Sequence, residues 1–286
     1  MGGSRAVDER GCARVKIVVC IKQVPGSNDV KIDPETKRIV REGARAVLNP
    51  FDLYAIEEAV RLRERFGGEV VALSMGPPSA GAVLREAVSI GADRGILLSG
   101  RAFAGSDTWA TSYALSRAIQ TIGDVDLILC GKQAVDGDTA QVGPGVAAHL
   151  GWQQATYVCE IVDVNVPAVT VRRLNEEGSD LCRLSLPAVL TVVKGINVPR
   201  VPSLRGVLAG HAAEIPVWAP EDIGASSDRI GLDASPTRVV ETSTPPPRAG
   251  ETQTLSGLPQ ESAKALAALL HACGLTGKEV CHAAGK

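Results

Sequence analysis

The sequence predicts a doubly wound, mostly parallel α/β fold. Apolar runs of strand length alternate along the first half of the chain with segments of helical length and spacing. The strand-like runs are apolar throughout, as expected of strands that are covered on both faces. Alternation of this kind produces a parallel sheet whose ligand lies at the carboxyl ends of the strands.

The first half of the chain supplies most of the expected sheet. In the helix expected at residues 52–66, apolar residues recur at helical spacing, and Gly67 and Gly68 end it. Residues 30–33 and 38–40 alternate around a Pro-Glu-Thr turn, which indicates a β-hairpin. The other expected elements are strands at 15–24, 70–74, 95–99 and 125–129 and helices at 80–90 and 109–122.

The second half of the chain has a different pattern of apolar, proline and turn residues. Two β-rich runs, at residues 158–174 and 182–193, are joined by a turn at 175–178. A proline-punctuated loop with a short helix follows at 200–220, and residues 260–272 have a strong helical pattern. We expect a disordered extension at 1–14, an α/β domain at 15–235, and a proline-rich linker with a C-terminal arm at 236–286 that includes Pro245, Pro246 and Pro247.

Composition excludes several classes of function. The 286 residues are 45% hydrophobic and 22% charged, as in soluble globular proteins. A formal charge of −2 and only 3% aromatic residues give no basic footprint or stacking platform for nucleic acid. No apolar stretch approaches the ~20 residues that insertion into a membrane requires, and the N-terminus lacks the apolar region of a secretory signal. Seven scattered cysteines favour a reducing, cytoplasmic location.

The segment Cys130–His149 is the most informative part of the chain. It joins an apolar strand to a helix-like run, and such a crossover presents backbone N–H groups and the positive end of a helix dipole to an anion. Proline is harmless only in the first turn of a helix, so Pro144 places the helix start near 141–143. The amides of residues 139–142 then remain free to bind a phosphate. Asp138, three residues before Gln141, also resembles a capping box, which allows an earlier start.

The other motifs in the sequence do not predict a further binding, catalytic or metal site. The G-x-G-x-x-A pattern at 143–148 begins about a dozen residues after the strand, which is the wrong context for a dinucleotide fingerprint, so we interpret it as a helix start. There is no Walker A motif and no Ser–His–Asp or Cys–His arrangement, so no catalytic residue is expected. His149 is expected at a helix C-terminus, where the dipole favours it. The spacing of His271, Cys273, Cys281 and His282 fits no recognised zinc pattern, so no metal is expected.

The string G-K-Q-A-V-D-G-D-T-A-Q-V-G-P resembles the nucleotide-binding signature of the electron-transfer flavoprotein β subunit. The resemblance covers roughly residues 15–235 and, more loosely, the C-terminal tail. Co-linear blocks are far more specific than any single motif. The four further blocks lie at 18–25 (VVCIKQVP), 49–59 (NPFD and then AIEEA), 74–77 (SMGP) and 87–95 (from Ala87 to GADRG).

The resemblance implies a nucleotide site that draws on several segments. Cys20 and Met75 would line an adenine pocket, although Met75 could equally fill the core. Gly131 would let the backbone approach the nucleotide, and Asp136 and Asp138 would accept from ribose hydroxyls or cap the helix. The remaining implied cofactor-binding residues are Asn49, Pro50, Phe51 and Asp52, which begin a nucleotide-contacting loop, and Thr139, Ala140, Gln141 and Val142, which would hold the phosphate.

Two positions point to a subgroup of the family. Typical members carry Asn and Thr at the positions of Ala140 and Val142 and hold AMP there. The version D-G-D-T-A-Q-V-G-P resembles the electron-bifurcating branch, whose β subunit carries a second FAD instead. That implies NADH as the substrate, ferredoxin or flavodoxin as one acceptor, and an acyl-CoA or similar dehydrogenase as the other, reached through the FAD of the α subunit. Residues 25–29 would form part of the NADH crevice.

Two alternatives remain open. One is a non-bifurcating subunit that binds AMP structurally and passes electrons between a dehydrogenase and a membrane quinone reductase. The other is a nucleotide-binding sensor or hydrolase, but such a self-contained protein needs neither a partner-recognition loop nor an arm. The resemblance places the partner-recognition loop at residues 201–208 and implies that Leu204 in this loop anchors the dehydrogenase. The alternative is that Leu204 is an ordinary core leucine. The C-terminal helix is too short to be stable alone and would dock on the α subunit of the heterodimer.

Overall fold

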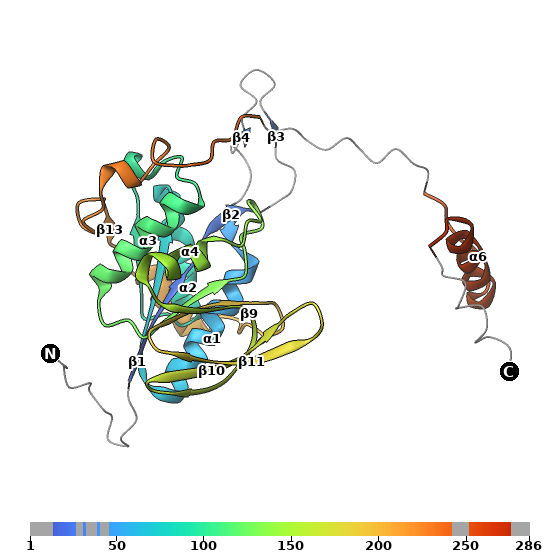
Figure 1. The fold of residues 1–286 in the computed structure, drawn as a ribbon, viewed down its shortest axis with the longest axis horizontal. Coiled ribbons are helices and arrows are strands. Elements are labelled where there is room, and N and C mark those ends of the chain that lie inside the picture. The colour runs from blue at the N-terminus through green and yellow to red at the C-terminus, as the bar shows by residue number, and fades with distance from the viewer. Residues whose placement is uncertain (1–13, 27–30, 33–38, 41–45, 242–251, 276–286) are drawn as a thin grey trace. The chain divides into compact units, whose positions relative to one another are not determined.

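Nine strands of the first of two units, residues 1–242, form one sheet. Neighbouring strands from β9 to β13 pair in parallel, whereas β10 is antiparallel to both β9 and β11. This confirms the expected mostly parallel α/β fold (Figure 1). In spatial order the strands are β11 (Ser179–Ser185), β10 (Ala168–Leu174), β9 (Gln153–Asn165), β12 (Ala188–Val192), β8 (Leu127–Gly131), β1 (Val15–Cys20), β6 (Gly68–Met75), β7 (Arg94–Leu98) and β13 (Val217–Trp218).

The computed structural model describes residues 14–26, 31–32, 39–40, 46–241 and 252–275. Nearly all of the extension expected at 1–14, and the three prolines 245–247, therefore lie outside the described residues. The expected hairpin is confirmed by the antiparallel pair β3 (Lys31–Ile32) and β4 (Ile39–Val40), although its turn is outside them too.

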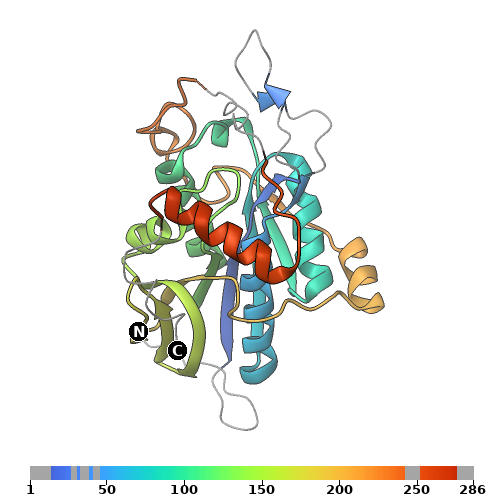
Figure 2. The ribbon, with the colours of Figure 1, turned by 90° about the vertical axis from the view of Figure 1, so that its right-hand side faces the viewer.

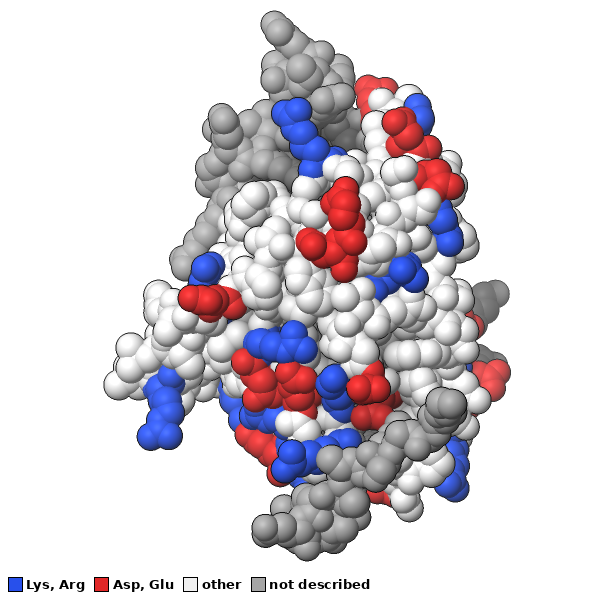
Figure 3. Space-filling view, turned by 90° about the vertical axis from the view of Figure 1, so that its left-hand side faces the viewer, with Lys and Arg blue, Asp and Glu red and all other residues white. Residues whose placement is uncertain are grey.

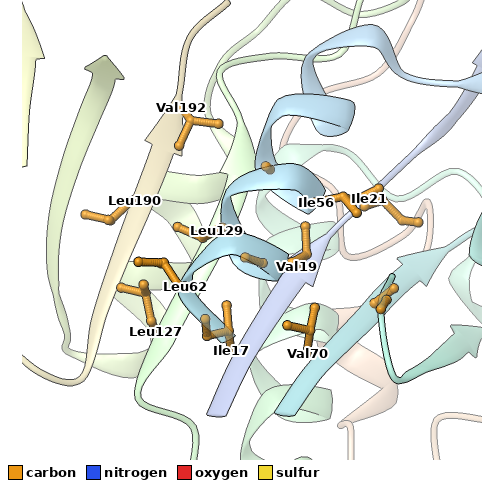
Figure 4. Packing of buried hydrophobic residues seen from close by; sticks show 14 of the residues in the cluster. Ile17, Val19, Ile21, Ile56, Leu62, Val70, Leu127, Leu129, Leu190 and Val192 are labelled. Atoms are coloured by element: carbon orange, nitrogen blue, oxygen red, sulfur yellow. The ribbon is translucent and has the colours of Figure 1, made fainter. Parts of the chain in front are cut away.

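Helices cover both faces of the sheet. Helices α1 (Pro50–Phe66) and α2 (Gly81–Ile90) pack on one face, and α3 (Thr108–Ile122) and α4 (Val142–Leu150) pack on the other. Each face has its own hydrophobic cluster because successive strand residues point to opposite sides. Ile17 and Val19 of β1 pack with Ile56 of α1 (Figure 4), whereas Val18 belongs to the cluster beneath α3 and α4. In the described part of this unit, 3-10 turns also occur at Pro78–Ala80, Arg101–Phe103 and Ser227–Arg229.

The order of the strands creates a switch point between β1 and β8. From β1 the chain passes through α1 to β6 and through α2 to β7, always moving to the same side. It then crosses by α3 to β8, which lies on the other side of β1. The connections after β1 and β8 therefore leave on opposite faces of the sheet, and the carboxyl ends of these two strands border the crevice where α/β proteins of this kind bind ligands.

The apolar run at 15–24 is not one strand, contrary to expectation. Strand β1 ends at Cys20, and the chain leaves the sheet to form β2 (Gln23–Pro25), which pairs with β5 (Ala46–Leu48). At the break, the backbone N–H of Lys22 donates to the side chain of Asp52 at 2.7 Å. A hydrogen bond to a residue 30 positions away cannot be read from an apolar pattern.

Each of the two β-rich runs is divided by a proline. Pro167 separates β9 from β10, and Pro187 separates β11 from β12, because proline cannot donate a ladder hydrogen bond. Strand β9 also begins at Gln153, before the expected position. Strand β12 returns to the sheet between β9 and β8. The β-rich extension beyond the parallel strands is therefore the hairpin of β10 and β11.

Helix α5 (Leu204–Ala212) packs on α2, beside which it is drawn in gold in Figure 2. On the face shown in Figure 3, acidic and basic side chains are interspersed. In the second unit, α6 (Pro259–Ala272) confirms the expected C-terminal helix. No helix in the described part of the chain has both the length and the apolar character needed to cross a membrane.

Candidate functional site

The carboxyl ends of β1 and β8 meet in a pair of buried cysteines. Cys20 and Cys130 are register partners on these strands, and both are free thiols. A hydrogen bond with Cys20, and then burial, raise the pKa of the Cys130 thiol well above its usual range. Buried neutral thiols of this kind are inert. Cys20, expected to line an adenine pocket, thus lies at the bottom of the switch point and packs with the cluster beneath α3 and α4.

The first turn of α1 places a carboxylate above this pair. Asp52 is 4% exposed. Its Oδ2 accepts from the backbone N–H of Lys22 at 2.7 Å, and its Oδ1 accepts from Nδ2 of Asn49 at 2.9 Å. Burial raises the pKa of Asp52 to about 7, opposed by hydrogen bonds from Asn49, Lys22 and the backbone of Gly131. The residue that follows β1 and the residue that precedes α1 therefore both donate to one carboxyl group.

Asn49 connects this carboxyl group to the loop between β8 and α4, residues 132–141, which we call the central loop. Its Nδ2 also donates to the carbonyl oxygen of Gln133 at 2.9 Å, and its Oδ1 accepts from the N–H of Val135 at 3.2 Å. Its own backbone N–H donates to the carbonyl oxygen of Lys22 at 2.9 Å. Asn49 is 1% exposed, so its side chain is turned into the protein. It binds together the end of β1, the start of α1 and the loop that follows β8.

Gly131 allows α1 to approach the end of β8. A Cβ atom at this position would lie 2.4 Å from Oδ1 of Asp52 and 2.7 Å from the carbonyl carbon of Phe51. Both distances are far below van der Waals contact. The absence of a side chain at Gly131 therefore allows the first turn of α1, which begins at Pro50, to pack against the end of β8.

The loop itself is held by polar contacts at its base and exposed at its tip. Lys22 Nζ pairs with Asp136 at 2.7 Å, and Gln133 Nε2 donates to Asp138. Asp136 and Asp138, which we expected to accept from ribose hydroxyls or to cap the helix, thus contact Lys22 and Gln133. Asp138 and Ala140 have positive φ angles of 52° and 55°, so the backbone reverses here through the left-handed region.

Helix α4 begins at Val142, as the position of Pro144 predicted. The capping-box alternative is wrong, because Gln141 is the N-cap residue and no side chain caps the helix. The amides of residues 139–142 donate to no acceptor within the described residues. The first turn of α4 contains no acidic residue, so the positive end of its dipole is uncompensated there. These amides are available to an anion.

Two glycines allow α4 to pack closely. A Cβ atom on Gly143 would lie 2.5 Å from Cγ2 of Thr191 on β12, and one on Gly145 would lie 2.6 Å from Oγ of Ser112 on α3. The G-x-G pattern therefore serves the contact of this helix with the sheet and with α3. That agrees with its interpretation as a helix start.

Lys132 was missed by sequence reasoning, although it belongs to the signature string. Its Nζ lies 5.4 Å from the ring centre of Phe51 and 5.2 Å from that of Tyr157. Tyr157, at a bulge in β9, has a φ of 59°. No carboxylate of the described residues pairs with Lys132. Ring faces hold its cation without neutralising it, which adds positive charge beside the loop.

The expected position of His149 at the end of a helix is confirmed, because it lies in the last turn of α4, but the helix dipole does not govern its charge. Its ring packs at a tilt against Trp109, with ring centres 4.5 Å apart, and meets the edge of Tyr113 at 5.7 Å. Burial lowers the pKa of His149, and its Nε2 has no hydrogen-bond partner within the described residues. The neutral form is therefore favoured, and aromatic packing outweighs the helix dipole.

The other expected residues make no hydrogen bond with Asp52 or Asn49 within the described residues, although Met75 packs against the same hydrophobic cluster as Cys20 and Cys130. Met75 ends β6 and is partly buried against the cluster beneath α3 and α4. Pro25 ends β2 and is followed by the exposed Gly26, whereas the remaining residues of the expected NADH crevice, 27–29, lie outside the described residues. In the second unit, His271 lies in α6, whereas Cys281 and His282 are also outside them.

Leu204 is the first residue of α5 and is 78% exposed, so the core interpretation is wrong. Val201 and Leu208, 89% and 63% exposed, are further exposed apolar residues near it. The helix is held firmly beneath them: a Cβ atom on Gly206 would lie 2.3 Å from the carbonyl oxygen of Ser89 on α2. An apolar surface is thus presented on a rigid support.

An ion-pair network fixes the chain that leads into α5. Arg200 Nε pairs with Glu57 of α1 at 2.8 Å, and its Nη1 pairs with Glu64 at 2.6 Å. Burial alone would raise the pKa of Glu57, but hydrogen bonds from Arg200 and Arg61 outweigh it and lower the pKa. The same helix α1 therefore carries the Asp52 cluster at its start and holds the α5 segment further along.

The parallel sheet, the switch point and the unpaired loop amides define an α/β protein of the type that binds an anion-bearing ligand at its strand ends. Comparison with known proteins makes the class specific. Residues 36–223 match the family model of the electron transfer flavoprotein domain. The chain belongs to the electron-transfer flavoprotein family and has the features of its β subunits.

Three relatives illustrate this membership. The chain is 47% identical over 239 residues to the electron transfer flavoprotein subunit beta of Thermoanaerobacterium thermosaccharolyticum, covering 83% of this chain and 91% of that protein. It is 45% identical over 237 residues to the caffeyl-CoA reductase-Etf complex subunit CarD of Acetobacterium woodii, covering 82% and 90%. It is 48% identical over 237 residues to protein FixA of Azotobacter vinelandii, covering 81% and 84%.

Proposed function

We propose that this chain is the β subunit of a heterodimeric electron-transfer flavoprotein that holds FAD at the switch point between β1 and β8 and takes part in NADH oxidation with electron bifurcation. The observation that carries the proposal is the row of amides at 139–142, which have no acceptor among the described residues and lead into the uncapped start of α4. Such a row suits a phosphate or diphosphate.

The chain's own residues support this cofactor by binding and electrostatics. The amides before α4 would hold the diphosphate, and Lys132 adds positive charge at the same edge of the sheet. Ala140 and Val142 have no polar side chain, so at these two positions the phosphate would be bound by backbone N–H groups alone. When bound, the flavin supplies the hydride and single-electron chemistry. No side chain of this site has to act as an acid, a base or a nucleophile.

The names of the relatives support the partner proteins that we propose for this reaction. One of them is a subunit of a caffeyl-CoA reductase-Etf complex, so an Etf chain of this type can work with an oxidoreductase of CoA thioesters. We therefore propose an α subunit, an acyl-CoA or similar dehydrogenase, and ferredoxin or flavodoxin as partners. The exposed leucine at the start of α5 would anchor the dehydrogenase, and α6 would dock on the α subunit.

The cofactor content of the purified heterodimer tests the proposal. Two FAD per heterodimer, one of them reduced by NADH, is the expected result. One FAD with one AMP would instead establish the non-bifurcating alternative. A heterodimer that retains neither a second FAD nor AMP would contradict a nucleotide site in this chain.

A charge change at the helix start tests the location of the site. Gln141→Glu places a negative charge beside the proposed diphosphate, while the helix dipole favours that charge at an N-cap. We expect unchanged or slightly higher thermal stability together with at least about tenfold weaker nucleotide binding. Gln120→Glu is the matched control, because it adds the same charge on α3 and keeps the acceptor for Arg117.

A further inference from the structure

Asp52 is a buried titratable group at the switch point, where the chain leaving β1, the start of α1 and the end of β8 meet. Its Oδ2 accepts from the N–H of Lys22 after β1 and its Oδ1 from Nδ2 of Asn49, while the backbone of Gly131 at the end of β8 lowers its pKa. The other charged or titratable groups facing it are the ammonium of Lys22 and the thiol of Cys130. Asp136 pairs with Lys22 and is thereby compensated.

The ionised carboxylate suits these donors, and the protonated acid does not. A carboxylate only accepts hydrogen bonds, whereas a protonated carboxyl turns one oxygen into an O–H donor. That oxygen would then face an N–H group, and one of the observed hydrogen bonds would be lost. Burial raises the pKa of Asp52 to about 7, so the change falls near neutral pH.

Loss of either hydrogen bond to Asp52 would change the contacts that hold the central loop. If Asn49 is released, its contacts with the carbonyl of Gln133 and the N–H of Val135 loosen. If the N–H of Lys22 is released, the residue whose ammonium holds Asp136 shifts instead. Both connections end in the segment that leads to the amides before α4.

We infer that Asp52 is a positioning residue whose ionised form, through Asn49 and Lys22, holds the central loop in the conformation that binds the nucleotide. The inference rests on the proposed nucleotide site and assigns a regulation to it. Asp52 is almost fully buried, so it acts on the site through these two residues. By reciprocity, nucleotide binding favours the ionised carboxyl and releases a proton.

The test is the affinity of the nucleotide-free heterodimer for AMP, measured by titration calorimetry from about pH 6 to about pH 8. We expect binding in the unmodified protein to strengthen by up to about tenfold over this range relative to Asp52→Asn, whose amide cannot ionise. The AMP phosphate titrates in the same way with the unmodified protein and with Asp52→Asn, so its effect cancels when the two pH profiles are compared. Asp163→Asn, an exposed substitution on β9, should retain the full pH dependence.

Equal pH profiles in the unmodified protein and in Asp52→Asn would overturn the inference. If the variant fails to assemble, amide exchange of Val135 in the unmodified heterodimer decides instead. After correction for the intrinsic rate, we expect faster exchange at the lower pH, and equal protection would overturn the inference. A heterodimer that binds no AMP or FAD at any pH refutes the proposed function, whereas the exchange measurement still tests Asp52.

Discussion

Lys22 and Asp136 form an ion pair of 2.7 Å that joins the residue after β1 to the loop after β8. It spans the switch point from one strand end to the other, although the residues are 114 positions apart. The side chains are 46% and 29% exposed, so solvent screens the pair and its contribution to global stability is small.

Removing this ion pair should loosen the loop without unfolding the protein. For Asp136→Asn we expect a loss of less than about 1 kcal/mol in the free energy of unfolding. Amide exchange at 133–138 should become faster, and the difference should shrink in high salt because an exposed pair is screened. A large loss of stability with unchanged loop exchange would show that Asp136 supports the fold and not the loop.

Substitution of Gly131 should be far more damaging. The added Cβ in Gly131→Ala would overlap Asp52 and Phe51, and both belong to a packed helix start that cannot move freely. We expect a loss of about 1–3 kcal/mol in the free energy of unfolding, measured by denaturant titration. Gly137→Ala is the matched control, since nothing lies within 4 Å of its added Cβ. Equal effects at the two positions would contradict the assigned packing.

The buried carboxyl of Asp52 also predicts a pH dependence of global stability. Its pKa in the folded state is raised to about 7, above its ordinary value of 3.8. A raised carboxyl pKa gives stability that is fully present below the ordinary value and is lost as the pH rises through the folded value, with a slope of roughly 1.4 kcal/mol per pH unit between the two values. The free energy of unfolding relative to Asp52→Asn, measured by denaturant titration at a series of pH values, should therefore decline from about pH 4 to about pH 7.

This decline is compatible with a loop that is better ordered at high pH. Global stability includes the cost of burying the charge, whereas the order of the loop depends on which N–H groups find an acceptor. A difference between the two proteins that stays constant over the range would show that Asp52 titrates normally.

Leu204 should affect electron delivery and not folding. The side chain is 78% exposed, so Leu204→Ala should change the free energy of unfolding by less than about 0.5 kcal/mol. If it anchors the dehydrogenase, the rate of electron transfer between the two proteins should fall at least about tenfold, as for a hot-spot residue. Leu232→Ala, an exposed leucine outside α5, is the control. Unchanged transfer would remove Leu204 from the interface.

The parts of the fold that local chemistry determines could be predicted from the sequence. Apolar strands alternate with amphipathic helices, so the parallel sheet was foreseeable, and Pro144 located the start of α4. The breaks at Pro167 and Pro187 were foreseeable too, because the prolines themselves are a local signal that interrupts a strand.

The interior of the site could not be predicted in the same way. Asn49 and Gln133 are 84 positions apart, and no pattern in either segment indicates that one amide serves both Asp52 and the loop. The resemblance pointed to the region around Asn49 and Gly131 but not to what these residues do there. Lys132 depends on two rings from distant elements, and His149 on two more, so both required the tertiary structure.

Amide hydrogen exchange at residues 139–142 tests the central claim most directly. The heterodimer would be compared with its adenine nucleotide bound and after its removal, with the amides of helix α3 as internal references. If these amides grip the phosphate groups, their exchange should slow by at least about tenfold on binding, since each gains an acceptor that it otherwise lacks. Identical exchange with and without the nucleotide would contradict the account.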